Sequence, residues 1–123
     1  MPRFVILEHD HPMIHWDFML EAGAMLRTWR LNAPPKPDGP VEAVASFNHR
    51  AVYLDYEGPV SGNRGMVRRW DAGTFTWTED TADRVAVRLA GMGLRGLAVL
   101  EKVAADRWSL RFEPEGRAED SSL

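Results

Sequence analysis

The sequence predicts a mainly β protein, a small closed antiparallel barrel of about eight strands with little helix. Short runs in which apolar and polar residues alternate recur at fairly even spacing along most of the chain. Neither a long amphipathic helix nor an internal repeat accompanies them. Closing such a sheet removes its edges, and about eight strands enclose an interior that side chains can fill. A sandwich of two sheets is the alternative.

The size and composition of the chain fit one domain. With 123 residues, 45% of them hydrophobic and 27% charged, the chain is long enough for one core and too short for two. We expect a barrel domain over residues 1–113 and a polar, flexible tail over 114–123. The chain has no cysteine, which excludes disulfides, thiolate zinc sites and cysteine catalysis and fits a reducing cytosol.

Charge and hydropathy exclude further classes. No apolar run is long enough to span a membrane, and the apolar stretch near Met1 is too short for a secretion signal. Fifteen basic and 18 acidic residues give a net charge of −3, so no overall basic field draws the protein to nucleic acid. Any polyanion would have to be held by a local patch.

The first half of the chain is predicted to form four strands. The clearest alternation lies at 15–21, where Trp16, Phe18 and Leu20 share one face. A proline-rich segment at 34–40 can be neither helix nor central strand, so it is a loop. The four predicted strands are 3–8, 15–21, 25–31 and 41–47, and 48–58 is predicted to be irregular or a single short helical turn.

The second half continues with short strands. A glycine-rich loop is predicted at 58–65, and strands 66–70 and 74–78 are predicted to form a hairpin across the Asp-Ala-Gly segment at 71–73. The remaining predicted strands are 84–89, 94–102 and 107–112, with the last two paired across a turn at 104–106.

Three of the four histidines lie within seven residues, and their spacing predicts a metal site. Residues two apart on a strand share a face, so His15 and Asp17 project together. A short connection can fold His9 back beside them. Two imidazoles and a carboxylate around one cation inside the closed sheet suit Mn²⁺, Zn²⁺ or Fe²⁺. A solvated polar strand face is the alternative, and His11, in the loop, is favoured less as a ligand.

A second group of candidates lies further along the chain. His49 and Tyr53 lie close together in sequence, and loops often carry function. His49 could donate to a phosphate oxygen or act as a general acid. Candidate anion-binding residues are Arg50, Arg64 and Arg68. Arg64, Arg68 and Arg69 form a basic stretch near the glycine-rich loop, although a run of charges is usually a solvated face.

Several ordered motifs resemble the 3′-phosphoesterase domain of bacterial multifunctional DNA ligase D. The chain has EHD at 8–10, HWDF at 15–18 and LE at 20–21, followed by Trp29. His49 and Tyr53 resemble the histidine and tyrosine of the family's D-H-P-x-x-Y run. DYEG at 55–58 and WDAGT at 70–74 resemble two further family motifs. The resemblance extends from about residue 3 to 112, nearly the whole chain.

The resemblance implies a cytoplasmic bacterial enzyme with a β-barrel fold. It implies a Mn²⁺-dependent phosphoesterase that removes a 3′-phosphate or 3′-ribonucleotide from DNA ends during repair. His9, His15 and Asp17 would bind the metal, and His49 would contact the scissile phosphate with Tyr53 beside it. The implied partners are a DNA 3′ end or a smaller phosphate ester, with a separate ligase or polymerase as a candidate protein partner.

Three departures from the family pattern concern phosphate binding. Met19 stands where the family has an arginine, Leu7 replaces a glutamine and Phe47 replaces a glutamate. Methionine cannot neutralise a phosphate. The family's N-terminal substrate-contacting arm is also expected to be absent. Arg27 is a further candidate, besides the three arginines above, for supplying the lost charge.

Three other functions remain open from the sequence. The departures at Met19 and Phe47 favour a non-catalytic module that keeps the metal and binds a DNA end or a partner. The order His15, Asp17, His49 also fits a non-haem iron oxygenase, although that would leave His9 unexplained. The third is a structural β domain with an incidental histidine cluster.

Overall fold

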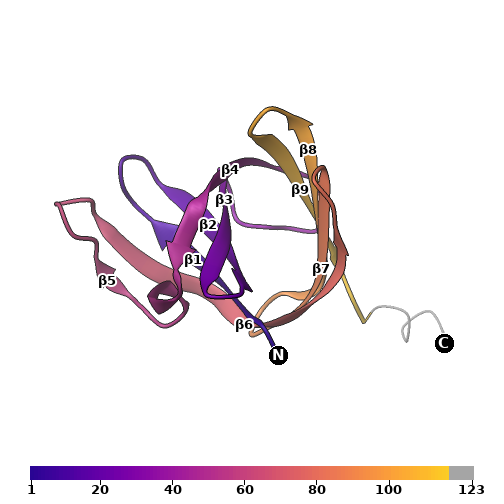
Figure 1. The fold of residues 1–123 in the computed structure, drawn as a ribbon, viewed down its shortest axis with the longest axis horizontal. Helices are drawn as coiled ribbons and strands as arrows, with labels where there is room; N and C mark the ends of the chain where they lie inside the picture. Colours follow the sequence, from indigo (N-terminus) through magenta and orange to yellow (C-terminus); the bar gives the residue numbers. More distant parts are fainter. Residues whose placement is uncertain (117–123) are drawn as a thin grey trace.

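The computed structural model describes residues 1–116 as a barrel of antiparallel strands (Figure 1). The tail predicted from residue 114 lies, apart from its first three residues, outside the described residues. One short 3₁₀ helix, η1, follows the fourth strand. The elements are β1 (Arg3–His9), β2 (His15–Ala22), β3 (Met25–Leu31), β4 (Val41–Arg50), η1 (Ala51–Leu54), β5 (Gly58–Pro59), β6 (Met66–Asp80), β7 (Arg84–Gly91), β8 (Arg95–Ala104) and β9 (Arg107–Pro114).

Eight of the strands close on themselves. Their order is β1-β2-β3-β4-β9-β8-β7-β6, and a further pairing of β6 with β1 completes the ring. Every pairing is antiparallel, and β5 adds two residues to β6 outside the ring. The predicted closed barrel is confirmed, and the two-sheet alternative is excluded by the β1–β6 pairing.

The two faces of the barrel wall carry two separate apolar clusters. The larger fills the interior with side chains from all eight strands of the ring, including Phe18 and Leu20 of β2. The smaller lies on the outer face of β1–β3 and contains Leu7, Met19 and Leu54 of η1. Because alternate residues of a strand point to opposite faces, odd-numbered residues of β2 project outward. The outer face next to the smaller cluster therefore carries the candidate site.

The hairpin predicted across Asp71-Ala72-Gly73 is wrong, because residues 66–80 form one continuous strand, β6. Asp71 is buried, and its carboxylate accepts backbone N–H bonds from Ala72, Gly93 and Leu94 at 2.8–3.0 Å. It thus satisfies the turn between β7 and β8 rather than forming a turn of its own. A side chain at Gly73 would collide with the carbonyl of Ala90 on the paired strand. Asp71 therefore stabilises the turn between β7 and β8, and Gly73 permits the close approach of β6 and β7.

The structure also differs from the predicted loop at 58–65 and from the predicted end of the fourth strand. Gly58 and Pro59, predicted as loop, pair with β6 as β5. The fourth strand runs on to Arg50, and the short helical turn predicted within 48–58 is η1. Within residues 1–116, no helix has the length and apolar character needed to cross a membrane.

Candidate metal centre and adjoining pocket

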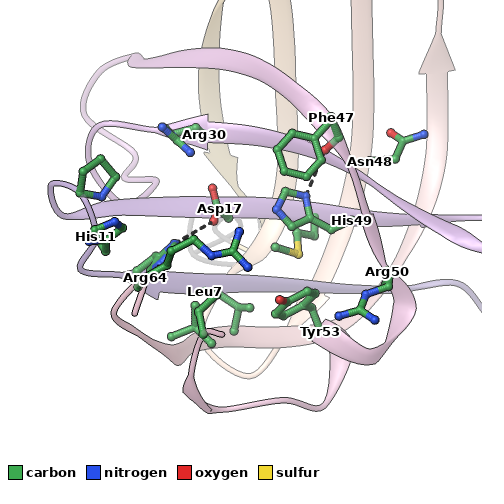
Figure 2. A pocket seen from close by; sticks show the side chains of 15 residues that line it. Leu7, His11, Asp17, Arg30, Phe47, Asn48, His49, Arg50, Tyr53 and Arg64 are labelled. Carbon is green, nitrogen blue, oxygen red and sulfur yellow. Dashed lines mark hydrogen bonds and ion pairs between the residues drawn. The ribbon is translucent and has the colours of Figure 1, made fainter. Parts of the chain in front are cut away.

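A pocket of about 370 Å³ opens on the outer face of the barrel wall (Figure 2). His9 and Asp17 line it from β1 and β2, and His49 and Tyr53 line it from the end of β4 and from η1. The fold therefore brings the two histidine-containing segments of the sequence to one cavity. The site lies outside the barrel, and the expectation of a cation inside the closed sheet is wrong because Asp17 alternates with the inward-facing Phe18.

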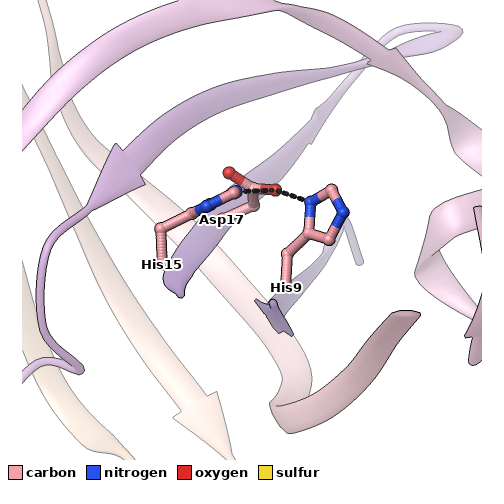
Figure 3. A group of neighbouring side chains, drawn as sticks. All are labelled: His9, His15 and Asp17. Carbon is pink, nitrogen blue, oxygen red and sulfur yellow. Dashed lines mark ion pairs between the residues drawn. The ribbon is translucent and has the colours of Figure 1, made fainter. Parts of the chain in front are cut away.

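The register of β1 and β2 brings the three predicted ligands together (Figure 3). His9 lies directly opposite His15 in the antiparallel pair, at the end of the hairpin that is closed by the loop at 10–14. Asp17 is two residues further along β2 on the same face. One potential ligand atom from each side chain lies within 4.8 Å of the other two. The closest approach, 3.3 Å, is between His15 Nε2 and Asp17 Oδ2, and His9 Nδ1 lies 3.9 Å from the same oxygen.

Backbone carbonyls fix the tautomer of each imidazole. His9 Nε2 donates to the carbonyl of Arg64 at 2.8 Å, and His15 Nδ1 donates to the carbonyl of Met13 at 2.9 Å. A carbonyl accepts only, so each of these nitrogens carries the proton. The lone pairs of His9 Nδ1 and His15 Nε2 are therefore turned toward Asp17. Outer hydrogen bonds of this kind orient histidines that bind metals.

This donor set fits a divalent cation. His15 Nε2 is buried and has no hydrogen-bond partner within the described part of the chain. A buried polar atom without a partner is costly, and a carboxylate cannot donate to it. Two imidazole nitrogens and a carboxylate oxygen suit Mn²⁺, Zn²⁺ or Fe²⁺. His11 also lines the pocket but is not one of the three clustered groups, and its ring centre lies 6.4 Å from that of His9.

A β-bulge directs His49 to this face. Thr28 of β3 pairs with Ser46 of β4 but Leu26 pairs with His49, so β4 has one extra residue between these positions. The bulge reverses the alternation of β4, and His49 pairs with a residue of the outer apolar cluster. Strict alternation from Val41 would have turned His49 inward.

Burial lowers the pKa of His49 below its ordinary value, although the negative charge of Asp17 opposes the change. Its Nδ1 donates to the carbonyl of Phe47 at 3.0 Å, which leaves Nε2 free to act in the pocket. Tyr53 packs edge-on against the imidazole with ring centres 5.8 Å apart. Tyr53 thus helps to fix the orientation of the ring.

The candidate arginines separate into two groups. Arg50 and Arg64 line the pocket, and the Arg64 side chain bonds to the carbonyl and hydroxyl of Ser61. Arg68 pairs with Glu8 at 2.8 Å, and it does not line this pocket. Arg27, which also lies away from the pocket lining, pairs with Asp80 and lies over two tryptophan rings.

Sequence reasoning missed Arg30. Arg30 lies directly opposite Asp17 on β3, is exposed, and lines the pocket (Figure 2). Alternation between the buried Trp29 and Leu31 could have shown that Arg30 points outward. Only the β2–β3 register shows that it lies beside Asp17.

The three departures from the family pattern differ in their surroundings. Leu7 and Met19 are fully buried in the outer apolar cluster beneath the pocket, with exposed fractions of 0% and 1%. Phe47 is 74% exposed and lies parallel to the His49 ring, with centres 4.6 Å apart. The first two therefore replace polar groups by apolar packing, whereas the third presents an open aromatic face.

The fold and this site define a class: small closed β-barrel proteins with two histidines and an aspartate clustered on the outer wall. Within that class, the chain belongs to the family described as DNA Ligase D 3'-phosphoesterase domain, whose sequence model matches residues 7–102.

Two relatives show the extent of the similarity. The chain is 32% identical over 115 residues to the multifunctional non-homologous end joining DNA repair protein LigD of Mycobacterium tuberculosis. It is 30% identical over 113 residues to the multifunctional non-homologous end joining protein LigD of Pseudomonas aeruginosa. The matches cover 85% and 88% of this chain but only 15% and 13% of those two proteins.

Proposed function

We propose that this protein is a Mn²⁺-dependent phosphoesterase that removes a 3′-phosphate or 3′-ribonucleotide from DNA ends. The observation that carries the proposal is the cluster of His9, His15 and Asp17 beside a pocket with basic residues. Membership of the 3'-phosphoesterase family supports the same chemistry. These three residues would hold the metal, which when bound would polarise a phosphoryl oxygen and activate a water molecule.

His49 would act on the phosphate from the opposite wall of the pocket. Its Nδ1 proton is held by the Phe47 carbonyl, so the group available to substrate is Nε2. The anionic phosphate favours the protonated imidazole when substrate is bound. Nε2 can then donate to a phosphate oxygen and offset the charge that develops on the leaving group. Tyr53 would keep the ring in position.

Arg30 would supply the positive charge that Met19 lacks. It reaches the pocket from β3 instead of β2, next to Asp17. Within residues 1–116 its guanidinium makes no ion pair, so it is available to an incoming anion. Arginine can bind phosphate through two parallel hydrogen bonds. Arg50 and Arg64 would complete the basic wall.

A primer–template with a 3′-phosphate, incubated with Mn²⁺, tests this function. Wild-type protein should release inorganic phosphate and leave a 3′-hydroxyl, and His15→Ala should abolish turnover. Arg88→Ala is the control, because Arg88 is exposed on β7, away from β2 in the barrel order. The absence of turnover in wild type, or unchanged turnover in His15→Ala, would refute the proposal.

A second candidate function is a metal-containing module that binds a DNA end for a separate ligase or polymerase without cleaving it. The apolar replacements at Leu7 and Met19 favour it, since they remove polar groups from the floor of the pocket. Binding of a 3′-phosphorylated end without product in Mn²⁺, Zn²⁺ or Fe²⁺ would select this function over hydrolysis.

A further inference from the structure

Phe47 is an exposed aromatic side chain at the wall of the pocket. Its exposed fraction is 74%, in a segment that is otherwise polar from Asn48 to Arg50. The ring lies at 11° to the imidazole of His49, with centres 4.6 Å apart, so one face is covered. The high exposure requires that much of the remaining surface is open to solvent. An open apolar ring at a site is a feature that a ligand can use.

The same bulge that turns His49 toward the pocket also contains Phe47. Phe47 therefore belongs to the pocket wall, where Figure 2 shows its ring beside His49 and across the cavity from Arg64. β4 is separated from β2 by β3, a width of about 10 Å at the usual strand spacing. A bare phosphate at Asp17 would not fill this width, whereas a phosphate with its nucleoside could extend across it.

An aromatic ring next to cationic side chains is the combination that binds unpaired nucleotides. Bases stack on aromatic rings whatever their identity, while arginines hold the backbone phosphates. The pocket has both, with Phe47 on one wall and Arg30, Arg50 and Arg64 around the cavity. A purely apolar partner surface is disfavoured as the occupant, because the residues next to Phe47 in the pocket lining include Asn48, His49 and Arg50.

We propose that Phe47 is a stacking platform for the base of the terminal nucleotide whose 3′-phosphate is bound at the metal centre. The inference rests on the proposed function and adds a substrate class: 3′ ends whose last base is unpaired or can leave the helix. Stacking is tolerant of base identity, so all four bases are accepted. A base that is still paired in a duplex cannot stack on this ring without first unpairing.

Fluorescence of 2-aminopurine tests the contact directly. The probe is a single-stranded oligonucleotide with 2-aminopurine as its 3′-terminal base and a 3′-phosphate. Stacking on Phe47 should quench the probe when it binds wild type, and Phe47→Leu should bind without this quenching. Phe47→Trp keeps an aromatic platform and should quench. Val103→Ala is the control, since Val103 is also an exposed apolar residue but lies on β8, outside the pocket.

Kinetic measurements distinguish a stacking role of Phe47 from a structural role. For ends with a terminal base, Phe47→Leu should raise KM roughly tenfold, within the range measured for base–aromatic contacts. For an abasic 3′-phosphate end, the same variant should behave like wild type. An equal loss on both substrates would show that Phe47 only supports His49, and would overturn the proposal. Unquenched binding of the probe to wild type would also overturn it.

The two proposals fail in different ways. Quenching on mixing is read before phosphate release and does not require it. Quenching that depends on Phe47, without turnover in any metal, would refute hydrolysis and support the base contact. Turnover that is insensitive to Phe47 and to the terminal base would support hydrolysis and refute the base contact.

Discussion

Asp17→Asn should remove most of the stabilisation that Mn²⁺ gives to the folded protein. In wild type a cation that binds only the folded state stabilises it by about 2.7 kcal/mol at a free concentration one hundred times its Kd. For a domain of this size, 1 kcal/mol corresponds to about 3–4 °C in Tm, so saturating Mn²⁺ should raise Tm by about 10 °C. Asp17→Asn removes the carboxylate ligand, so most of that increase should be lost.

Without metal the same substitution should stabilise the folded protein. In wild type, His15 Nε2 is buried without a partner, and the group nearest to it is an acceptor, Asp17 Oδ2, at 3.3 Å. An asparagine amide at that distance can donate to the nitrogen. One such hydrogen bond contributes about 1 kcal/mol, so metal-free Asp17→Asn should melt about 3–4 °C above metal-free wild type.

Thermal unfolding of both proteins, after chelation and again with added Mn²⁺, measures all four values. Arg88→Ala should show the full wild-type response to the metal, because Arg88 lies on β7, away from the cluster. Calorimetric titration with Mn²⁺ provides an independent measure of binding. An equal Mn²⁺-induced rise in wild type and Asp17→Asn would refute the assignment of the metal to this cluster.

Three further substitutions test other parts of the structure. Arg30→Gln should lower kcat/KM for 3′-phosphate ends about tenfold. This effect lies in the lower part of the range for hydrogen bonds to charged groups, because the Arg30 side chain is exposed. Activity equal to that of Arg88→Ala would contradict this prediction. Asp71→Ala should lower Tm by about 10 °C, since two part-buried N–H groups of the β7–β8 turn lose their buried acceptor at a cost of roughly 3 kcal/mol. A change within 1 °C would contradict this prediction. Burial lowers the pKa of His49, so the unfolded chain binds the proton first. In metal-free protein the free energy of unfolding should therefore fall as the pH drops below about 6.5 toward the folded-state pKa. Urea unfolding should show a smaller loss for His49→Asn, and an identical pH slope in both proteins would refute this prediction.

Alternation in the sequence determined most of the barrel. The strands from Arg3 to Leu31 follow from local patterns, because a strand that buries one face must repeat its apolar residues every second position. The pair His15 and Asp17 follows from the same rule, since neighbours two apart share a face whatever the rest of the fold does. The family motifs pointed to His49 and Tyr53 as further members of the candidate site without giving their geometry, and they did not point to Arg30.

The tertiary structure alone decided how the strands continue and which face the site occupies. Asp71 and Gly73 are residue types that are common in turns, and the sequence around them predicted one. Their actual partners, the turn between β7 and β8 and the neighbouring strand β7, lie far away in sequence, so a local sequence pattern does not show them. The bulge that brings His49 beside the pocket depends on how β4 pairs with β3, and a one-residue offset reverses every later side chain. Arg30 likewise lies next to Asp17 only through the β2–β3 register. Local sequence thus specified which side chains share a strand face, whereas strand pairing specified which faces and residues meet.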